Sequence, residues 1–326
     1  MRTAHQPLTL AVLGLGTALS LSACSLLPDQ ASHANGPYPQ TVDSPYGSAT
    51  ITAQPEKIAV TSSIDFDIAV ALGEDPVVAP ALSDKKASPW AAEALDDAGR
   101  DTPALYDAEK GPDVEAIREA QPDVILATGL DDVAEHFDEL SDIAPVVAAE
   151  DDATWTDRTA AVATALNKAK EAESSVNDIN AEAEEVAAHH LEFEDTTYAR
   201  ADVTADSIDY LSYSGSDDSF FTGIGMFQNS AAEDYSAKKH SVTKPQVDQL
   251  DADALLIHFP DVGQTMLDED ELEDPFYREV KVIRGKHYTV LDDNTFAALT
   301  NLSPLSYDWL LQDFPDDLGK AEQGFL

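Results

Sequence analysis

The feature that constrains the fold most is a long helical stretch near the middle of the chain. From residue 156 to residue 190, small and apolar residues recur every three or four positions, and neither Pro nor Gly interrupts them. Thr156 is a residue type that often caps a helix N-terminus. We therefore predict one helix over residues 156–190, which would extend roughly 50 Å and could act as a strut.

Both flanks of this stretch predict alternating strands and helices. Short apolar runs alternate with helical patterns, which is typical of parallel βα units. Tyr38 to Ile51 predicts a hairpin that turns at residues 44–47. On the N-terminal side the predicted strands are 58–60, 76–79, 124–127 and 145–147, and the helices are 64–72, 90–95, 113–120 and 131–140. On the C-terminal side the predicted strands are 197–204, 208–211, 254–257 and 288–291, with helices over 219–227 and 303–313.

An internal similarity indicates that the two flanks are alike. Residues 123–126, an Asp followed by a buried strand, correspond to residues 253–256 at an offset of 130 positions. The preceding helix shows the same offset, since Glu115 corresponds to Pro245. We predict two similar lobes, residues 38–155 and 191–326, with the strut of residues 156–190 between them.

The N-terminus predicts export. Residues 1–23 contain Arg2 and an apolar stretch that is too short for a transmembrane helix, which is typical of a secretory signal. The stretch ends in Leu21-Ser22-Ala23-Cys24, which resembles the lipobox of bacterial lipoproteins. The resemblance implies that Cys24 is acylated and that residues 24–37 form a flexible tether. Because Cys24 is the chain's single cysteine, intramolecular disulfides and cysteine-rich zinc sites are excluded.

The charge balance excludes some partners. The chain has 62 Asp and Glu against 19 Lys and Arg, a formal net charge of −43. Nucleic acids and anionic membrane surfaces both attract clustered cations, so neither is an expected electrostatic partner.

Motifs for catalysis and for direct metal capture are absent from the sequence. There is no Gly-x-Ser-x-Gly, no P-loop and no His-Glu-x-x-His. We therefore predict a protein that is not an enzyme and has no resident metal or cofactor. Haem ligation by His258 stays open as an alternative.

Several segments resemble one family in order and spacing. Residues 55–60, 71–78, 111–117 and 121–126 are similar to segments of the substrate-binding proteins of iron–siderophore and cobalamin ABC transporters. The resemblance implies an α/β fold of two Rossmann-like lobes joined by a single long α-helix, with a ligand cleft between the lobes. It also implies a monomer, anchored by lipid to the outer face of the cytoplasmic membrane, that delivers ligand to an ABC permease and its ATPase.

The candidate ligand-binding residues combine aromatic walls with a few donors, which suits a bulky ferric siderophore of the hydroxamate type. They are Ser62, Lys85, Trp90, Tyr106, Arg200, Tyr210, Tyr213, Phe221, His258 and Phe296. Iron would arrive already coordinated by the siderophore, so the protein needs no metal ligands. The basic residues Lys238, Lys239, His240 and Lys244 would favour a catecholate or citrate chelate if they faced the cleft. Haem, cobalamin and a non-transport ligand-binding lipoprotein also remain open.

The resemblance further implies one acidic docking residue on each lobe for the permease. Glu115 occupies the first-lobe position. Pro245 occupies the second, which departs from the pattern, and Asp248 or Asp251 could replace it.

Overall fold

The structure is a computed structural model that describes residues 38–82, 86–204, 207–212, 219–236, 240–260, 267 and 275–324. The predictions for residues 1–37, including Cys24, lie outside the described residues. So do those for Lys85, Tyr213, Lys238 and Lys239.

The first lobe is built on a parallel sheet with the strand order β5-β4-β3-β6-β7. Its strands are β3 (Ile58–Val60), β4 (Pro76–Pro80), β5 (Ala104–Tyr106), β6 (Val124–Ala127) and β7 (Val146–Ala148). Its helices are α1 (Ser63–Ala71), α2 (Pro89–Asp97), α3 (Val114–Ala120) and α4 (Val133–Ser141). The predicted hairpin is confirmed as the antiparallel pair β1 (Gln40–Ser44) and β2 (Gly47–Ile51). Strand β5 was not predicted.

The second lobe has its own sheet, in the order β10-β8-β11-β12, with β9 antiparallel to β8. Its strands are β8 (Thr196–Val203), β9 (Ile208–Tyr210), β10 (Met226–Gln228), β11 (Ala254–His258) and β12 (Tyr288–Leu291). Its helices are α7 (Ser219–Gly223), α9 (Pro275–Glu279), α10 (Lys281–Arg284), α11 (Asp293–Thr300) and α12 (Pro304–Gln323), with the 3-10 turns η1 (Leu191–Phe193), η2 (Ser230–Asp234) and η3 (Lys244–Leu250). The predicted α/β class with parallel sheets is confirmed, but the helix predicted over residues 219–227 is wrong in its second half, because α7 ends at Gly223 and β10 follows it.

The internal similarity at an offset of 130 residues is also present in the structure. Asp123 and Asp253 each precede a fully buried central strand, β6 and β11. The Asp123 Oδ2 accepts the backbone N–H groups of Glu56 and Lys57, at 2.9 and 3.0 Å. Asp253 Oδ2 accepts the N–H and hydroxyl of Thr197, at 2.8 and 2.6 Å. In both lobes the hydrogen bonds of this Asp hold the start of the central strand against the start of a neighbouring strand, β3 for Asp123 and β8 for Asp253.

The prediction of one helix over residues 156–190 is wrong. Two helices cover this stretch, α5 (Trp155–Leu166) and α6 (Ala169–His189), the second of them 21 residues long. The break is at Asn167, whose φ of 55° is left-handed, while the N–H of Lys168 donates to Ala163 O at 2.7 Å. Asn at the position after a helix is a known stop signal that the prediction overlooked. The cap of α5 is Thr154, in a capping box with Asp157, and not Thr156.

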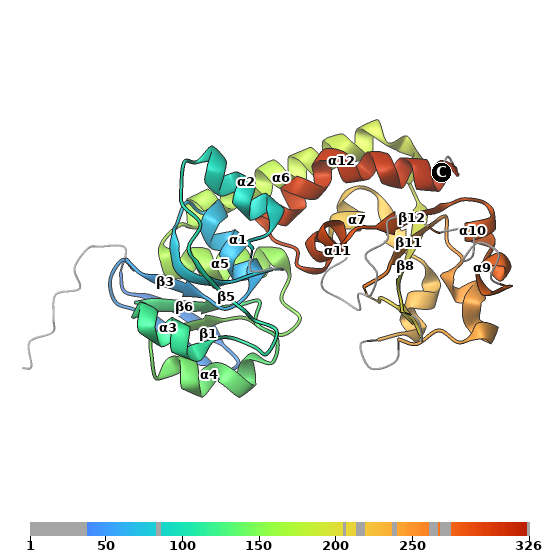
Figure 1. The fold of residues 1–326 in the computed structure, drawn as a ribbon. Coiled ribbons are helices and arrows are strands. Elements are labelled where there is room, and N and C mark those ends of the chain that lie inside the picture. The colour runs from blue at the N-terminus through green and yellow to red at the C-terminus, as the bar shows by residue number, and fades with distance from the viewer. Residues whose placement is uncertain are drawn as a thin grey trace, which may run out of the picture. The chain divides into compact units, whose positions relative to one another are not determined.

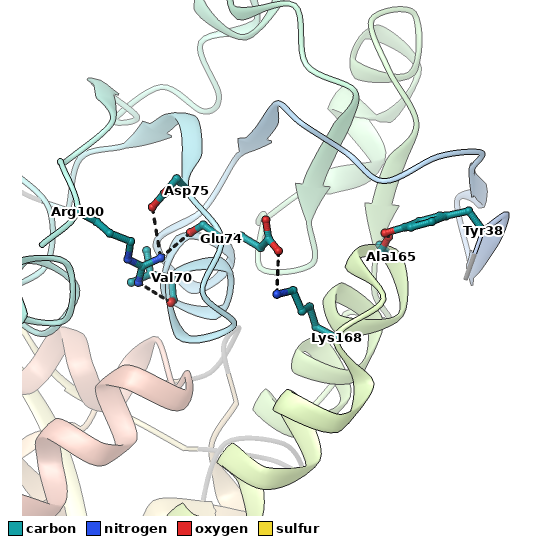
Figure 2. A network of polar contacts seen from close by, with 7 residues as sticks. All are labelled: Tyr38, Val70, Glu74, Asp75, Arg100, Ala165 and Lys168. Carbon is teal, nitrogen blue, oxygen red and sulfur yellow. Dashed lines mark hydrogen bonds and ion pairs between the residues drawn. The ribbon is translucent and has the colours of Figure 1, made fainter. Parts of the chain in front are cut away.

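Contacts from the first lobe hold this break in place (Figure 2). Lys168 Nζ lies 3.2 Å from a carboxylate oxygen of Glu74, just after α1. From the loop after α2, Arg100 donates to the carbonyl oxygens of Val70 and Glu74, at 2.9 and 3.1 Å. The end of α1 is therefore tied both to the α5–α6 junction and to the loop after α2.

Helices α6 and α12 pack side by side (Figure 1). One continuous apolar core includes Val60 of the first sheet, Ile179 of α6, Leu310 of α12 and Leu256 of the second sheet. This shared core means that both sheets are packed against the same helices. Among the described residues, no helix combines the length and apolar character needed to cross a membrane.

Asp67 of α1 joins three helices through a fully buried carboxylate. It accepts hydrogen bonds from Trp90 Nε1 at 2.5 Å and from Ser88 Oγ at 3.2 Å, both at the start of α2. It also accepts one from Ser303 Oγ, the N-cap of α12, at 2.8 Å and 236 positions away in the sequence. Burial raises the pKa of Asp67 to about 7, although these three donors act in the opposite direction.

Replacing Asp67 with Asn should remove a pH dependence of stability. An unfolded Asp has a pKa of about 3.9, so the unfolded chain loses this proton first as pH rises. Asp67 should therefore make the free energy of unfolding fall between about pH 4 and pH 7, and it should add no further slope above that range. Asp67→Asn should lack this contribution and show a shallower decline, as measured by urea unfolding at a series of pH values. Identical pH profiles for Asp67→Asn and wild type would contradict the assignment, and the exposed Asp142→Asn serves as the control.

Candidate functional site

A cavity of about 890 Å³ lies at the carboxyl ends of strands β3, β4, β5 and β6. Ligands of open α/β sheets bind at this edge, because strand ends and helix N-termini meet there. Among the described lining residues, Asn301, between α11 and α12, comes from outside the first lobe. The others lie at the ends of the four strands, in the loops that follow them or at the starts of α1 and α4, and are 61–63, 80–82, 107–111, 129–132, 135 and 136.

A second buried carboxylate, Asp65, shapes the rim of this cavity. Its Oδ1 accepts the backbone N–H of Thr128 at 2.9 Å and the Thr128 hydroxyl at 2.6 Å. Its Oδ2 accepts the Ser62 hydroxyl at 2.6 Å and the Gly129 N–H at 3.3 Å. Burial raises the pKa of Asp65, and the four hydrogen bonds oppose that shift. Asp65 therefore ties the loop after β3 to the loop after β6.

Gly129 allows these two loops to approach closely. A Cβ atom added to Gly129 would lie 2.7 Å from Ser62 Oγ and 2.8 Å from Ile64 Cβ. Contacts this short would force one loop to move, so the rim in its present form requires glycine here.

The described part of the cavity lining is acidic. It contains five carboxylates against Lys110 as its one lysine or arginine and His136 as its one histidine. The carboxylates are Asp107, Glu109, Asp131, Asp132 and Glu135. All five side chains are exposed, so solvent reaches them in the absence of ligand.

Polar side chains also meet at the carboxyl end of the second sheet. His258 is the last residue of β11. Its Nδ1 lies 2.9 Å from Asp202 Oδ1, and its Nε2 lies 3.2 Å from Asp293 Oδ1. Its ring stacks on Phe296 with centroids 3.8 Å apart, and the Arg200 guanidinium lies 5.5 Å from the Phe296 ring. Burial raises the pKa of Asp202, while His258 and Arg200 act to lower it.

The structure thus brings together three predicted residues, Arg200, His258 and Phe296, at the second-sheet edge. Arg200 is buried and its Nη2 donates to Thr300 Oγ1 at 3.4 Å. The side chain of His258 is only 7% exposed, and carboxylates contact both ring nitrogens. Of the predicted ligand residues that the structure describes, Ser62 lines the first-lobe cavity.

Four predicted aromatic residues lie in the packed interior. Trp90 Nε1 donates a hydrogen bond to Asp67 Oδ2, and the Tyr106 hydroxyl donates to Val60 O at 3.1 Å. Tyr210 donates to Asn229 Oδ1 at 2.6 Å, and Phe221 stacks on Tyr198 at 3.9 Å between centroids. The sequence alone does not distinguish an aromatic side chain in a ligand wall from one in the core, because both bury a large apolar area.

The prediction missed most of the acidic lining. Asp107, Glu109 and Lys110 follow β5, the strand that was not predicted. Asp131, Asp132 and Glu135 were assigned only to a helix start. A general rule, that polar residues directly after parallel strands line the ligand edge, would have found them. Within the described ranges, no group of three or more His, Cys, Asp or Glu is placed to hold a metal ion.

The chain thus has two α/β sheets that are connected in sequence through α5 and α6, with a cavity at the carboxyl edge of the first sheet. The sequence pattern of the periplasmic binding protein family matches residues 58–295. The chain belongs to this family of extracytoplasmic binding proteins. No curated protein matches the sequence.

Solved structures share the fold. PiaA from Streptococcus pneumoniae TIGR4 in complex with ferrichrome has a TM-score of 0.75 and 22% identity, over 87% of this chain and 99% of that chain. A periplasmic solute binding protein from Mycobacterium smegmatis has a TM-score of 0.71 and 22% identity, over 87% and 98%. SirA from Staphylococcus aureus complexed with staphyloferrin B has a TM-score of 0.66 and 19% identity, over 86% and 97%.

Asp65→Asn should destabilise the protein by about 2–3 kcal/mol. The amide would present its own N–H groups to buried donors, which would leave at least one of them unsatisfied. Urea unfolding would measure the loss. Asp138→Asn, an exposed change on α4, should stay within about 0.5 kcal/mol of wild type. An Asp65→Asn protein as stable as wild type would show that this carboxylate does not hold the rim.

Proposed function

We propose that the chain is the substrate-binding component of an ABC importer that binds a ferric siderophore, with the hydroxamate type favoured. The observation that carries the proposal is the cavity of about 890 Å³ at the carboxyl ends of β3 to β6. Its volume suits a ligand of siderophore size, since small-molecule pockets run from about 300 to 1,000 Å³. The chain belongs to a family of binding proteins, and its structural relatives include one solved with ferrichrome, a ferric hydroxamate.

The second-sheet edge supplies the other half of the proposed site. Phe296 is partly exposed and offers an aromatic face, and the guanidinium of the buried Arg200 lies 5.5 Å from its ring. His258 supports Phe296 by stacking, and its engaged ring nitrogens argue against haem ligation. Asn301 extends the first-lobe cavity with an amide from the second part of the chain.

The proposal places the protein on the outer face of the cytoplasmic membrane as a monomer. Cys24, at the end of the lipobox-like segment, would carry the lipid. Two acyl chains suffice for stable attachment to a membrane, so no spanning helix is required. The permease and its ATPase are the proposed protein partners.

Permease docking is proposed at Glu115 in the first turn of α3, where its side chain is exposed. On the second lobe, the Asp251 carboxylate forms an ion pair with Lys281 Nζ at 3.3 Å and accepts a hydrogen bond from the Val282 N–H at 3.1 Å. Asp248 is exposed and is therefore the better second-lobe candidate.

Binding should quench the fluorescence of Trp90, Trp155 and Trp309, because ferric chelates absorb in the emission range of tryptophan. The panel contains ferric hydroxamates, ferric catecholates, ferric citrate, haem and cobalamin, with absorbance corrected. Saturable quenching by a ferric siderophore at submicromolar concentration is expected. Selective binding of haem or cobalamin would show that this compound, and not a ferric siderophore, is the substrate. No binding by any compound would overturn the proposal.

Glu115→Ala should lower siderophore uptake by cells without changing ligand affinity, because the residue lies outside the cavity. Glu119→Ala is the matched control, since this exposed residue is on the same helix. Uptake of labelled chelate and affinity by titration are measured for both variants. Wild-type uptake in Glu115→Ala cells would exclude its docking role.

A further inference from the structure

The charge of the cavity lining bears on which ferric chelate the protein selects. This inference rests on the proposed function and concerns the same site. The described lining carries five carboxylates and one lysine, a formal charge of −4 when His136 is neutral. The whole chain adds a field of the same sign, with a formal charge of −43.

The N-termini of two helices at this edge of the sheet, α1 and α4, do not offset that charge. A helix N-terminus carries partial positive charge and attracts anions. In α4, the N-cap residue is Asp132, and Glu135 lies in the first turn. In α1, the first turn contains the buried Asp65. Each of these two helix ends that an anionic ligand could approach thus already has a carboxylate of the protein.

Ferric siderophores differ sharply in net charge. A ferric tri-catecholate carries a charge of about −3, a simple ferric trihydroxamate is neutral, and a trihydroxamate with a free amine is a cation at neutral pH. One carboxylate about 8 Å from a unit charge in water changes affinity roughly twofold. Three such carboxylates therefore change it by about tenfold at low salt, and less when salt screens them.

We propose that the cavity selects a cationic ferric hydroxamate, one with a free ammonium group, over neutral and anionic chelates. Asp131, Asp132 and Glu135 determine this specificity from the start of α4. Their side chains are exposed, so they attract the ammonium through space and keep their own hydration. The iron and its hydroxamates occupy the cavity as in the proposed function.

A pair of probes isolates the charge. Ferrioxamine B is a ferric trihydroxamate with one free ammonium, and its N-acetyl derivative has the same chelate without that charge. Ferric enterobactin is the anionic probe. Binding of each to the full chain carrying Cys24→Ser is measured by calorimetry at low salt and again at about 1 M salt, where the Debye length is about 3 Å.

Matched variants isolate the residues. D131N/D132N/E135Q neutralises three lining carboxylates. D138N/E139Q/D142N neutralises three exposed carboxylates on or just after the same helix, α4, that do not line the cavity. Both triple variants change the net charge of the chain by the same amount.

We expect ferrioxamine B to bind about tenfold more tightly than its N-acetyl derivative at low salt. This preference should shrink at high salt and in D131N/D132N/E135Q, and should persist in D138N/E139Q/D142N. Equal binding of the two hydroxamates, equal effects of the two triple variants, or tighter binding of ferric enterobactin would overturn the charge inference while siderophore binding stands. Binding of none of the three probes would count against the proposed function itself.

Discussion

The arrangement of this protein depends on a carboxylate that has no access to water. Asp67 accepts hydrogen bonds from Trp90 and Ser88 at the start of α2 and from Ser303 at the start of α12. A buried carboxylate is costly unless its oxygens are satisfied, so the three donors must be held in place together. Because Ser303 lies 236 positions from Asp67, this single group fixes where the last long helix begins against the first lobe. Packing of α12 on α6 then carries that placement to the second sheet.

Two residues earlier on the same helix, Asp65 has a different role. It faces the strand ends and ties the loop after β3 to the loop after β6, with Gly129 allowing the close approach. One short helix therefore contains two buried acids, of which one organises the helices and the other the rim of the cavity. The five acids of the described cavity lining are exposed instead, which leaves their charge available to a ligand. The buried carboxylates hold the structure, and the exposed carboxylates are those proposed to select the ligand.

Much of the fold followed from local patterns. The hairpin, the central strands and the similarity between residues 123–126 and 253–256 were predictable, because buried parallel strands are continuous apolar runs with sharp boundaries. The end of α5 was predictable in principle, since Asn167 is a common residue for a left-handed helix stop. Strand β5 (Ala104–Tyr106) was not predictable, because it has three residues and only one of them is buried. So short a run shows no clear apolar pattern. The aromatic candidates were the weakest part: Trp90, Tyr106, Tyr210 and Phe221 have the composition of a ligand wall but lie in the core.

The sequence by itself determined the class of fold, the two similar lobes, the acidic charge and the family, because each depends on composition or on patterns within a few tens of residues. Only the tertiary structure decided which polar residues share a site. Asp202, His258 and Asp293 come from two strands and a helix start, and they meet because parallel strands end at a common edge. The lining of the first-lobe cavity is assembled in the same way from four strand ends and Asn301. Distances between residues so far apart in the chain are set by the packing of the sheets and helices, which local sequence patterns do not specify.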